Sequence, residues 1–146
     1  MIALLDVNML VALFDHEHVH HLTAHDWFAD NGDSGWASCP ITENGALRVL
    51  ASPQFQLHIP LGKLANLLRR FCERSAHKSW PDDVSLLNSA VVDVGQIRGH
   101  KQLTDAYLLA LAVKNAGRLV TFDDGVPLGA VKGARSEHLV VLAPGA

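Results

Sequence analysis

Four carboxylate side chains stand where the predicted strands and helices of this chain begin or end: Asp6, Glu43, Asp105 and Asp123. Carboxylates that are brought close together raise one another's pKa values, and a divalent cation removes that conflict. Ligand sets made only of oxygen favour Mg²⁺ or Mn²⁺, whereas Zn²⁺ usually recruits His or Cys. One or two such ions polarise a phosphodiester and activate a water for its hydrolysis. These residue types therefore predict a metal-dependent site for phosphoryl chemistry.

The stretch from Thr104 to Asp124 predicts how two of these acids meet. A helix over Asp105–Ala116 would rise about 18 Å. After a Gly turn, a strand over Arg118–Phe122 would return about 16 Å. Because the outward and return paths match in length, we expect Asp105 and Asp123 to become neighbours.

Strands and helices alternate along the rest of the chain. The strands are predicted over Ile2–Leu5, Trp36–Cys39, Lys78–Trp80, Arg118–Phe122 and His138–Leu142. Besides Asp105–Ala116, helices are predicted over Val7–Phe14, His20–Asp30, Thr42–Leu50, Pro60 to about Ala76, and from Asp82 or Asp83 to about Val94. This alternation predicts a three-layer α/β/α domain with a mainly parallel central sheet. A length of 146 residues fits a single domain over 1–146.

The four acids are expected on one edge of that sheet, because sites in such sheets form outside the carboxyl ends of the strands. Asp6 ends the first strand, and Asp123 ends the strand after the long helix. Glu43 begins the helix after the second strand, and Asp105 begins the helix that leads back to the sheet. For each acid alone, a first-turn helix charge or a turn residue is the alternative interpretation.

Polar and basic side chains flank this predicted site. Asn8 lies two residues after Asp6, and Thr121 lies two residues before Asp123, so both are candidates for orienting ligands or waters. The candidates for contacting substrate phosphates lie after Glu43 or shortly before Asp105, and they are Arg48, Arg98, His100 and Lys101. Ordinary solvated charge is the alternative for these four.

The charge distribution is uneven, with a net charge of −3. No Lys or Arg precedes Arg48, so all 12 basic residues lie in the remainder of the chain. That remainder is compatible with a polyanionic partner but lacks the strongly basic character of a dedicated nucleic-acid binder. No apolar run approaches the ~20 residues of a membrane span, and the N-terminus has no signal-peptide pattern. Cys39 and Cys72 follow no ligand spacing, which favours reduced thiols in a cytoplasmic protein.

Five histidines crowd into the segment from His16 to His25. The pairs His16/His20 and His21/His25 have the i, i+4 spacing that can bind a transition metal on a helix. The residues between His21 and His25 are Leu22, Thr23 and Ala24, so that pair lacks the Glu of an HExxH motif. A solvated, partly interfacial helix is the favoured interpretation. A subsidiary hypothesis is a pH-sensitive contact with a partner through these groups.

Several segments together resemble a known family. The matching segments are LLDVNMLVALFD, WASCPITENGALRVL and GHKQLTDAYLLALAVKNAGRLVTFDDG, with HEHVHHLTAHDWF and SWPDDVSLL between them. In these segments, which cover most of its length, the chain resembles the PIN-domain ribonucleases, and among them the VapC-type toxins of bacterial toxin–antitoxin pairs. The resemblance implies cleavage of RNA that depends on Mg²⁺ or Mn²⁺, dimer formation, and inhibition by a cognate antitoxin.

The resemblance also implies an acidic set around the metal, made of Asp6, Glu43, Asp105 and Asp123. Asp124 stands where the family usually carries a non-acidic residue, so it is an alternative to Asp123. Two other functions fit the acids. One is a different phosphohydrolase in which Asp6 is a phosphorylated nucleophile, and the other is a non-catalytic binding module stabilised by a structural ion.

Overall fold

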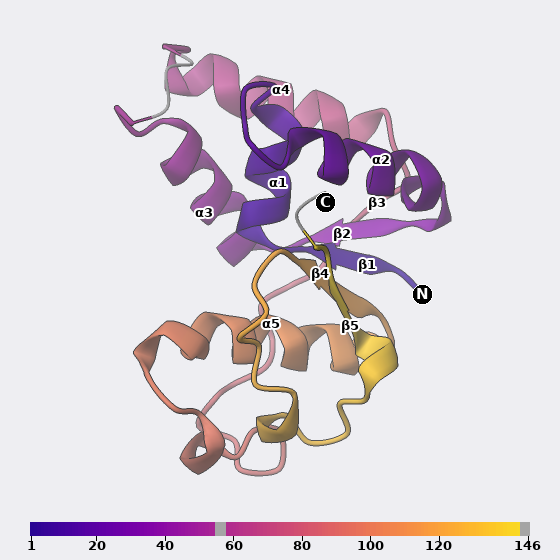
Figure 1. Ribbon diagram of the computed structural model, residues 1–146, viewed down its shortest axis with the longest axis vertical. Helices are drawn as coiled ribbons and strands as arrows, with labels where there is room; N and C mark the ends of the chain where they lie inside the picture. Colours follow the sequence, from indigo (N-terminus) through magenta and orange to yellow (C-terminus); the bar gives the residue numbers. More distant parts are fainter. Residues whose placement is uncertain (55–57, 144–146) are drawn as a thin grey trace.

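The computed structural model describes residues 1–54 and 58–143. Its strands form one parallel sheet in the order β3-β2-β1-β4-β5 (Figure 1). The strands are β1 (Ala3–Leu5), β2 (Trp36–Ser38), β3 (His77–Ser79), β4 (Arg118–Thr121) and β5 (Leu139–Val141).

Helices cover both faces of the sheet. The α-helices are α1 (Val7–Phe14), α2 (His21–Asn31), α3 (Pro40–Leu50), α4 (Leu61–Glu73) and α5 (Leu103–Lys114). Short 3₁₀ helices cover Gly32–Ser34, Val94–Gln96, His100–Gln102, Leu128–Ala130 and Ser136–His138. Figure 1 shows α1 to α4 on one side of the sheet and α5 on the other. No helix in the described part of the chain is long and apolar enough to cross a membrane.

The strands have alternating side chains that build a core on each face. Leu4 and Leu119 pack in the cluster formed with α5. Leu5, Trp36 and Val120 pack in the opposite cluster, beneath α1 and α2. Successive side chains of a strand point to opposite faces, and both faces of the central strand β1 are covered, so β1 is apolar and buried throughout. The three-layer α/β/α prediction is confirmed.

The strand order places a switch point between β1 and β4. From β1 the chain proceeds outward to β2 and then β3, and it later returns to add β4 and β5 on the other side. Open parallel sheets bind ligands in the crevice outside the carboxyl ends of the strands at such a point. Asp6 directly follows β1, and Asp123 follows β4 after one intervening residue. The topology alone therefore brings these two acids to the same crevice.

A close approach of α1 and α3 narrows one side of this crevice. A Cβ atom added at Gly45 would lie 2.6 Å from Cγ2 of Val7, a distance that real Cβ atoms do not reach. Gly45 is therefore required for this packing, which holds the first turn of α1 against α3.

The strands and most helices lie within a few residues of their predicted bounds, but the helix predicted from Asp82 to Val94 is wrong. Asp82 accepts a hydrogen bond from the backbone N–H of Ile41 at 3.1 Å, at the start of α3, instead of capping a helix of its own. The side chains of Ser85 and Asn88 accept backbone N–H groups two residues ahead. Such local bonds compete with helix formation, and the segment is built of turns.

Candidate active site

Three aspartates from separate elements line one cavity of about 330 Å³. Asp6 caps the N-terminus of α1, Asp105 lies in the first turn of α5, and Asp123 follows β4. The complete lining is Asp6, Val7, Asn8, Val11, His18, Val49, Asp105 and Asp123. We call this the aspartate cavity. It lies at the switch point between β1 and β4.

Neutral donors hold Asp6 in place. Its Oδ1 accepts the backbone N–H of Val7 at 2.7 Å, and its Oδ2 accepts the hydroxyl of Thr121 at 2.7 Å. Only 6% of Asp6 is exposed. Burial raises the pKa of Asp6 in spite of these two hydrogen bonds. The environment therefore favours a positive charge beside this carboxylate.

Asn8 and Thr121 connect Asp6 with the segment that carries Asp123. Asn8 Nδ2 donates to Thr121 Oγ1 at 3.2 Å, and Asn8 Oδ1 accepts the backbone N–H of Phe122 at 3.2 Å. The same Thr121 oxygen accepts the backbone N–H of Asp123 at 3.0 Å. Both residues were predicted to have supporting roles, and in the structure they position the aspartates. Thr121 is completely buried, so it acts only through these bonds.

The carboxyl groups of Asp105 and Asp123 interact, and their pKa values shift in opposite directions. Burial raises the pKa of Asp105 to about 8, and the hydrogen bond with Asp123 and the charges of Asp6 and Asp123 act in the same direction. The same hydrogen bond lowers the pKa of Asp123. Asp105 is the more deeply buried of the two, with 8% of its surface exposed, and its raised pKa favours the form that carries a proton near neutral pH. A cation that binds here would displace this proton.

Asp124 has a different environment from Asp123. Its side chain is exposed, and it lines a separate hollow together with Arg98 and Gly125. Asp123 Oδ1 instead accepts the backbone N–H of Gly125 at 2.8 Å, which fixes its carboxylate beside Asp105. The structure thus brings Asp123, and not Asp124, to the aspartate cavity.

Glu43, the fourth acid of the predicted set, does not line the aspartate cavity. It lies at the same edge of the sheet, where its Oε2 accepts the hydroxyl of Ser38 at 2.6 Å. Ser38 has a single proton to donate, so its 2.7 Å contact with His77 Nε2 requires the His77 ring to donate. Burial lowers the pKa of His77, in agreement with a neutral ring.

Glu43 lines a second cavity of about 400 Å³, which we call the Glu43 cavity. Its other lining residues come from α3, α4 and β3, and they are Leu47, Ala65, Leu68, Arg69, Cys72, Glu73, His77 and Ser79. Glu43 lines this cavity and not the aspartate cavity because of the rotation of α3 about its axis. With 3.6 residues per turn, Glu43 and Leu47 share the face towards α4, whereas Val49 lies on the face towards the aspartates.

The four predicted phosphate-binding residues are exposed, and they are Arg48, Arg98, His100 and Lys101. His100 and Lys101 form the short 3₁₀ helix that runs directly into α5, and Asp105 follows in the first turn of α5. None of the four takes part in an ion pair within residues 1–54 and 58–143. They are therefore available to a polyanion, although none of them lines the aspartate cavity.

The rings of His16 and His20 have stacking partners other than their predicted i, i+4 partners. The His16 ring stacks on His21, with centroids 4.7 Å apart, and the His20 ring stacks on Phe122 at the same separation. His18 was not singled out from the sequence, yet it lines the aspartate cavity. His18 lies twelve residues after Asp6, so no local sequence pattern connects the two residues. The turn after α1 returns the chain to the cavity.

The donor set fits a hard cation with an incomplete protein shell. Across the described residues, no three His, Cys, Asp or Glu side chains already surround a single point as metal ligands would. Mg²⁺ keeps several waters and commonly uses one or two carboxylates directly, so an open group of aspartates suits it. The cavity lining has three aspartates and no Lys or Arg, and the pKa of Asp105 is raised by burial and by its acidic neighbours.

The fold and this cavity define a class: a parallel α/β domain that presents carboxylates at the switch point of its sheet, as metal-dependent phosphoryl-transfer enzymes do. The PIN domain family matches residues 3–131. The chain therefore belongs to the PIN-domain family, among its VapC-type ribonucleases.

Three relatives from Mycobacterium tuberculosis show the extent of the similarity. The chain is 46% identical to Ribonuclease VapC44 over 142 residues, which cover 97% of this chain and all of that protein. It is 44% identical to Ribonuclease VapC38, covering 85% and 86% of the two chains. It is 40% identical to Ribonuclease VapC39, covering 84% and 89%.

A solved structure supports the fold. The crystal structure of PAE2754 from Pyrobaculum aerophilum superposes with a TM-score of 0.57 at 21% identity, covering 92% of this chain and 82% of that one. At this level of identity the likeness concerns the arrangement of the strands and helices.

Proposed function

We propose that this chain, as a single domain over 1–146, is an endoribonuclease that depends on Mg²⁺ or Mn²⁺ and is the toxin of a toxin–antitoxin pair. The observation that carries the proposal is the aspartate cavity, which Asp105 and Asp123 line together with the buried Asp6. The near full-length similarity to proteins named as VapC ribonucleases supports RNA as the substrate.

In this proposal Asp6, Asp105 and Asp123 hold the metal, directly or through its waters. Asn8 and Thr121 keep Asp6 and Asp123 in fixed orientations through their hydrogen bonds. A bound divalent cation would polarise the scissile phosphate and lower the pKa of an attacking water. The contribution of the protein is a set of oriented carboxylates whose repulsion is relieved only when positive charge arrives.

Glu43 has a supporting place in this proposal. It lies at the same sheet edge but shares its carboxylate with Ser38, so we assign it to the border of the site and not to direct contact with the metal. Asp124 belongs to the surface beside Arg98. Exposed Arg48, Arg98, His100 and Lys101 guide the RNA backbone towards the cavity, because phosphate contacts position a nucleic acid without reading its sequence.

The proposed partners are the RNA substrate, a cognate antitoxin protein and a second copy of the chain in a homodimer. The proposed location is the cytoplasm, where both RNA and antitoxin are found. The family membership supports these assignments.

The decisive experiment compares purified protein with three single variants, Asp6→Asn, Asp105→Asn and Asp124→Asn, on total RNA with Mg²⁺, Mn²⁺ or EDTA. We expect cleavage by the native protein and by Asp124→Asn, and none by the other two or in EDTA. Cleavage that survives EDTA, or that survives both Asp6→Asn and Asp105→Asn, would overturn the proposal.

The same experiment separates the rival functions. A phosphohydrolase with an Asp6 nucleophile would form an aspartyl-phosphate, but both oxygens of Asp6 already accept hydrogen bonds and the residue is 6% exposed. A non-catalytic module would be stabilised by metal without cleaving RNA. Neither rival has an observation in its favour.

A further inference from the structure

His18 lies at the aspartate cavity although it comes from the turn between α1 and α2. Its half-buried side chain is one of the residues that line the cavity with Asp6, Asp105 and Asp123. His18 is the one residue of that lining with an aromatic ring. Its imidazole therefore differs chemically from the acids and the aliphatic residues around it.

One nitrogen of His18 already has a partner. The backbone N–H of His20 donates to His18 Nδ1 at 3.0 Å. Nδ1 must therefore be the unprotonated nitrogen, and the neutral ring carries its proton on Nε2. Burial and the neighbouring His20 lower the pKa of His18, which favours this neutral form near neutral pH. His18 thus offers one N–H donor at its outer end.

The turn that carries His18 is anchored at both ends. The backbone N–H of His18 donates to the carbonyl of Asp15 at 3.0 Å, and the His18 carbonyl accepts the N–H of His21 at 3.0 Å. The buried carboxylate of Asp15 accepts the N–H of Glu17 at 3.0 Å. These bonds hold the backbone of the turn, and the N–H of His20 holds the His18 ring at Nδ1.

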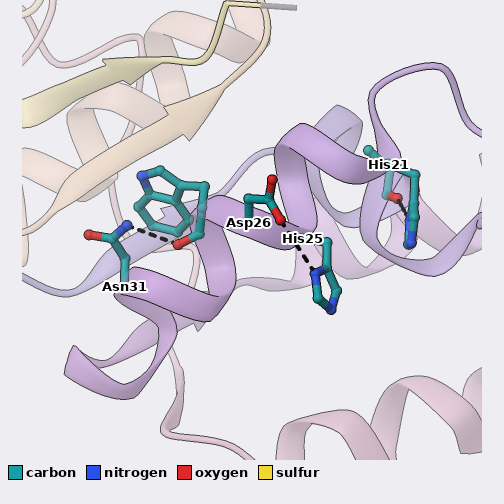
Figure 2. Close-up of polar contacts among 6 residues, drawn as sticks. His21, His25, Asp26 and Asn31 are labelled. Carbon is teal, nitrogen blue, oxygen red and sulfur yellow. Dashed lines mark hydrogen bonds and ion pairs between the residues drawn. The ribbon is translucent and has the colours of Figure 1, made fainter. Parts of the chain in front are cut away.

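His20 and His21, which follow in the chain, connect this turn to Phe122 and to α1. The His20 ring stacks on Phe122, which directly precedes Asp123. His21 Nδ1 contacts the Ala12 carbonyl at 2.7 Å and fastens α2 to α1, as Figure 2 shows. His25 differs from these residues: it is exposed and interacts with Asp26 at 3.9 Å on the same helix (Figure 2).

We propose that His18 donates its Nε2 proton in a hydrogen bond to a non-bridging phosphate oxygen of the RNA strand held at the aspartate cavity. This role rests on the proposed ribonuclease function. The carboxylates bind positive charge but repel a phosphate, so the phosphate needs a donor in the same cavity. A protonated nitrogen cannot bind a metal, and His18 therefore complements the acids instead of joining them.

Two variants of His18 separate the donor from the fold of the turn. Asn retains an acceptor near the position of Nδ1 for the N–H of His20 but is too short to donate at the outer end. Gln is long enough to place an N–H near the position of Nε2. His25→Asn, from the exposed face of α2, is the matched control.

The measurement is the binding of a fluorescently labelled RNA oligonucleotide of mixed sequence, with Ca²⁺ in place of Mg²⁺, followed by cleavage of the same RNA in Mg²⁺. We expect His18→Asn to weaken binding roughly tenfold, the usual scale for one hydrogen bond to a charged group. His18→Gln should bind within about threefold of the native protein on the same scale, and His25→Asn should bind as the native protein does.

Equal binding by His18→Asn and the native protein would overturn the inference. Equal weakening by Asn and Gln would also overturn it, because packing and not donation would then be responsible. If His18→Asn melts well below the native protein, His18→Met, which fills the space without a donor, takes its place in the comparison. The proposed function is judged separately, because only Asp6→Asn and Asp105→Asn test whether the cavity cleaves RNA.

Discussion

The aspartate cavity and the Glu43 cavity lie at one edge of the sheet. The surroundings of their carboxylates differ. In the first, Asp6, Asp105 and Asp123 face one another, and the pKa of Asp105 rises to about 8. In the second, Glu43 receives a hydrogen bond from the buried hydroxyl of Ser38, which is in turn held by His77. The first cavity gathers three carboxylates with no Lys or Arg in its lining, whereas the lining of the second includes Arg69.

This difference shows that acids at the same edge of the sheet need not line the same cavity. The direction of the side chain also matters, and in α3 it is set by helix rotation and by the contact of Gly45 with Val7. The predictions that follow test whether the two cavities differ in function as they do in structure.

The largest expected difference is between Asp105→Asn and Glu43→Gln. Outer-shell partners of a metal site typically contribute about 10–100-fold in activity, so loss of a direct ligand should exceed about a hundredfold and loss of Glu43 should stay near tenfold. The measurement is the initial rate of RNA cleavage in Mg²⁺. Equal losses would contradict the contrast and would place the Glu43 carboxylate among the metal ligands when the metal is bound.

A second test replaces a buried hydroxyl in each region. Thr121→Val removes the donor to Asp6 and should lower metal affinity roughly tenfold, measured by titration calorimetry with Mn²⁺. Thr42 is equally buried and bonds only within the start of α3. Thr42→Val should therefore reduce stability and leave metal affinity unchanged. A loss of affinity in both variants would mean that general loosening, and not the bond to Asp6, is responsible.

The third test concerns pH. The pKa of Asp105 is raised from 3.8 to about 8 in the folded state. Between these values the folded protein binds more protons than the unfolded chain, so the metal-free protein should lose stability as pH rises from about 5 to about 8. Saturating Mg²⁺ should reverse much of this loss. Thermal melting in EDTA and in Mg²⁺ measures both effects.

Asp105→Asn is the control for this pH dependence. It removes the titrating carboxyl group with little change in shape, so its melting temperature in EDTA should vary much less over the same range. A native protein with a flat profile would show that the two aspartates do not repel one another as the structure indicates.

The smallest expected effect comes from Ser38→Ala in the Glu43 cavity. The change leaves Glu43 and His77 without their shared hydroxyl, and we expect a loss of about 1 kcal/mol in the free energy of unfolding. Urea denaturation measures this loss. Cleavage should stay within about twofold of the native rate, since an outer-shell bond of Asp6 would contribute tenfold or more. A large loss of activity would instead show that the two cavities act as one functional unit.

Much of the fold and part of the site could be predicted from the sequence. The alternation of apolar strands with helices predicted the layers, and the positions of Asp6 and Asp123 after two strands predicted their meeting. Both inferences depend only on distance along the chain and on the parallel direction of the strands. The segment from Asp82 to Val94 could not be predicted in this way, because Asp82 bonds to the distant start of α3.

The sequence by itself determined that Asp6, Asp105 and Asp123 would gather, because short strands and a matched helix leave them no other edge. Only the tertiary structure decided that Glu43 turns towards Ser38, that Asp124 faces away from Asp105, and that His18 reaches the cavity. The physical reason is that chain position fixes the edge on which a residue lies. The direction of its side chain depends on helix rotation and on hydrogen bonds to residues far away in the chain.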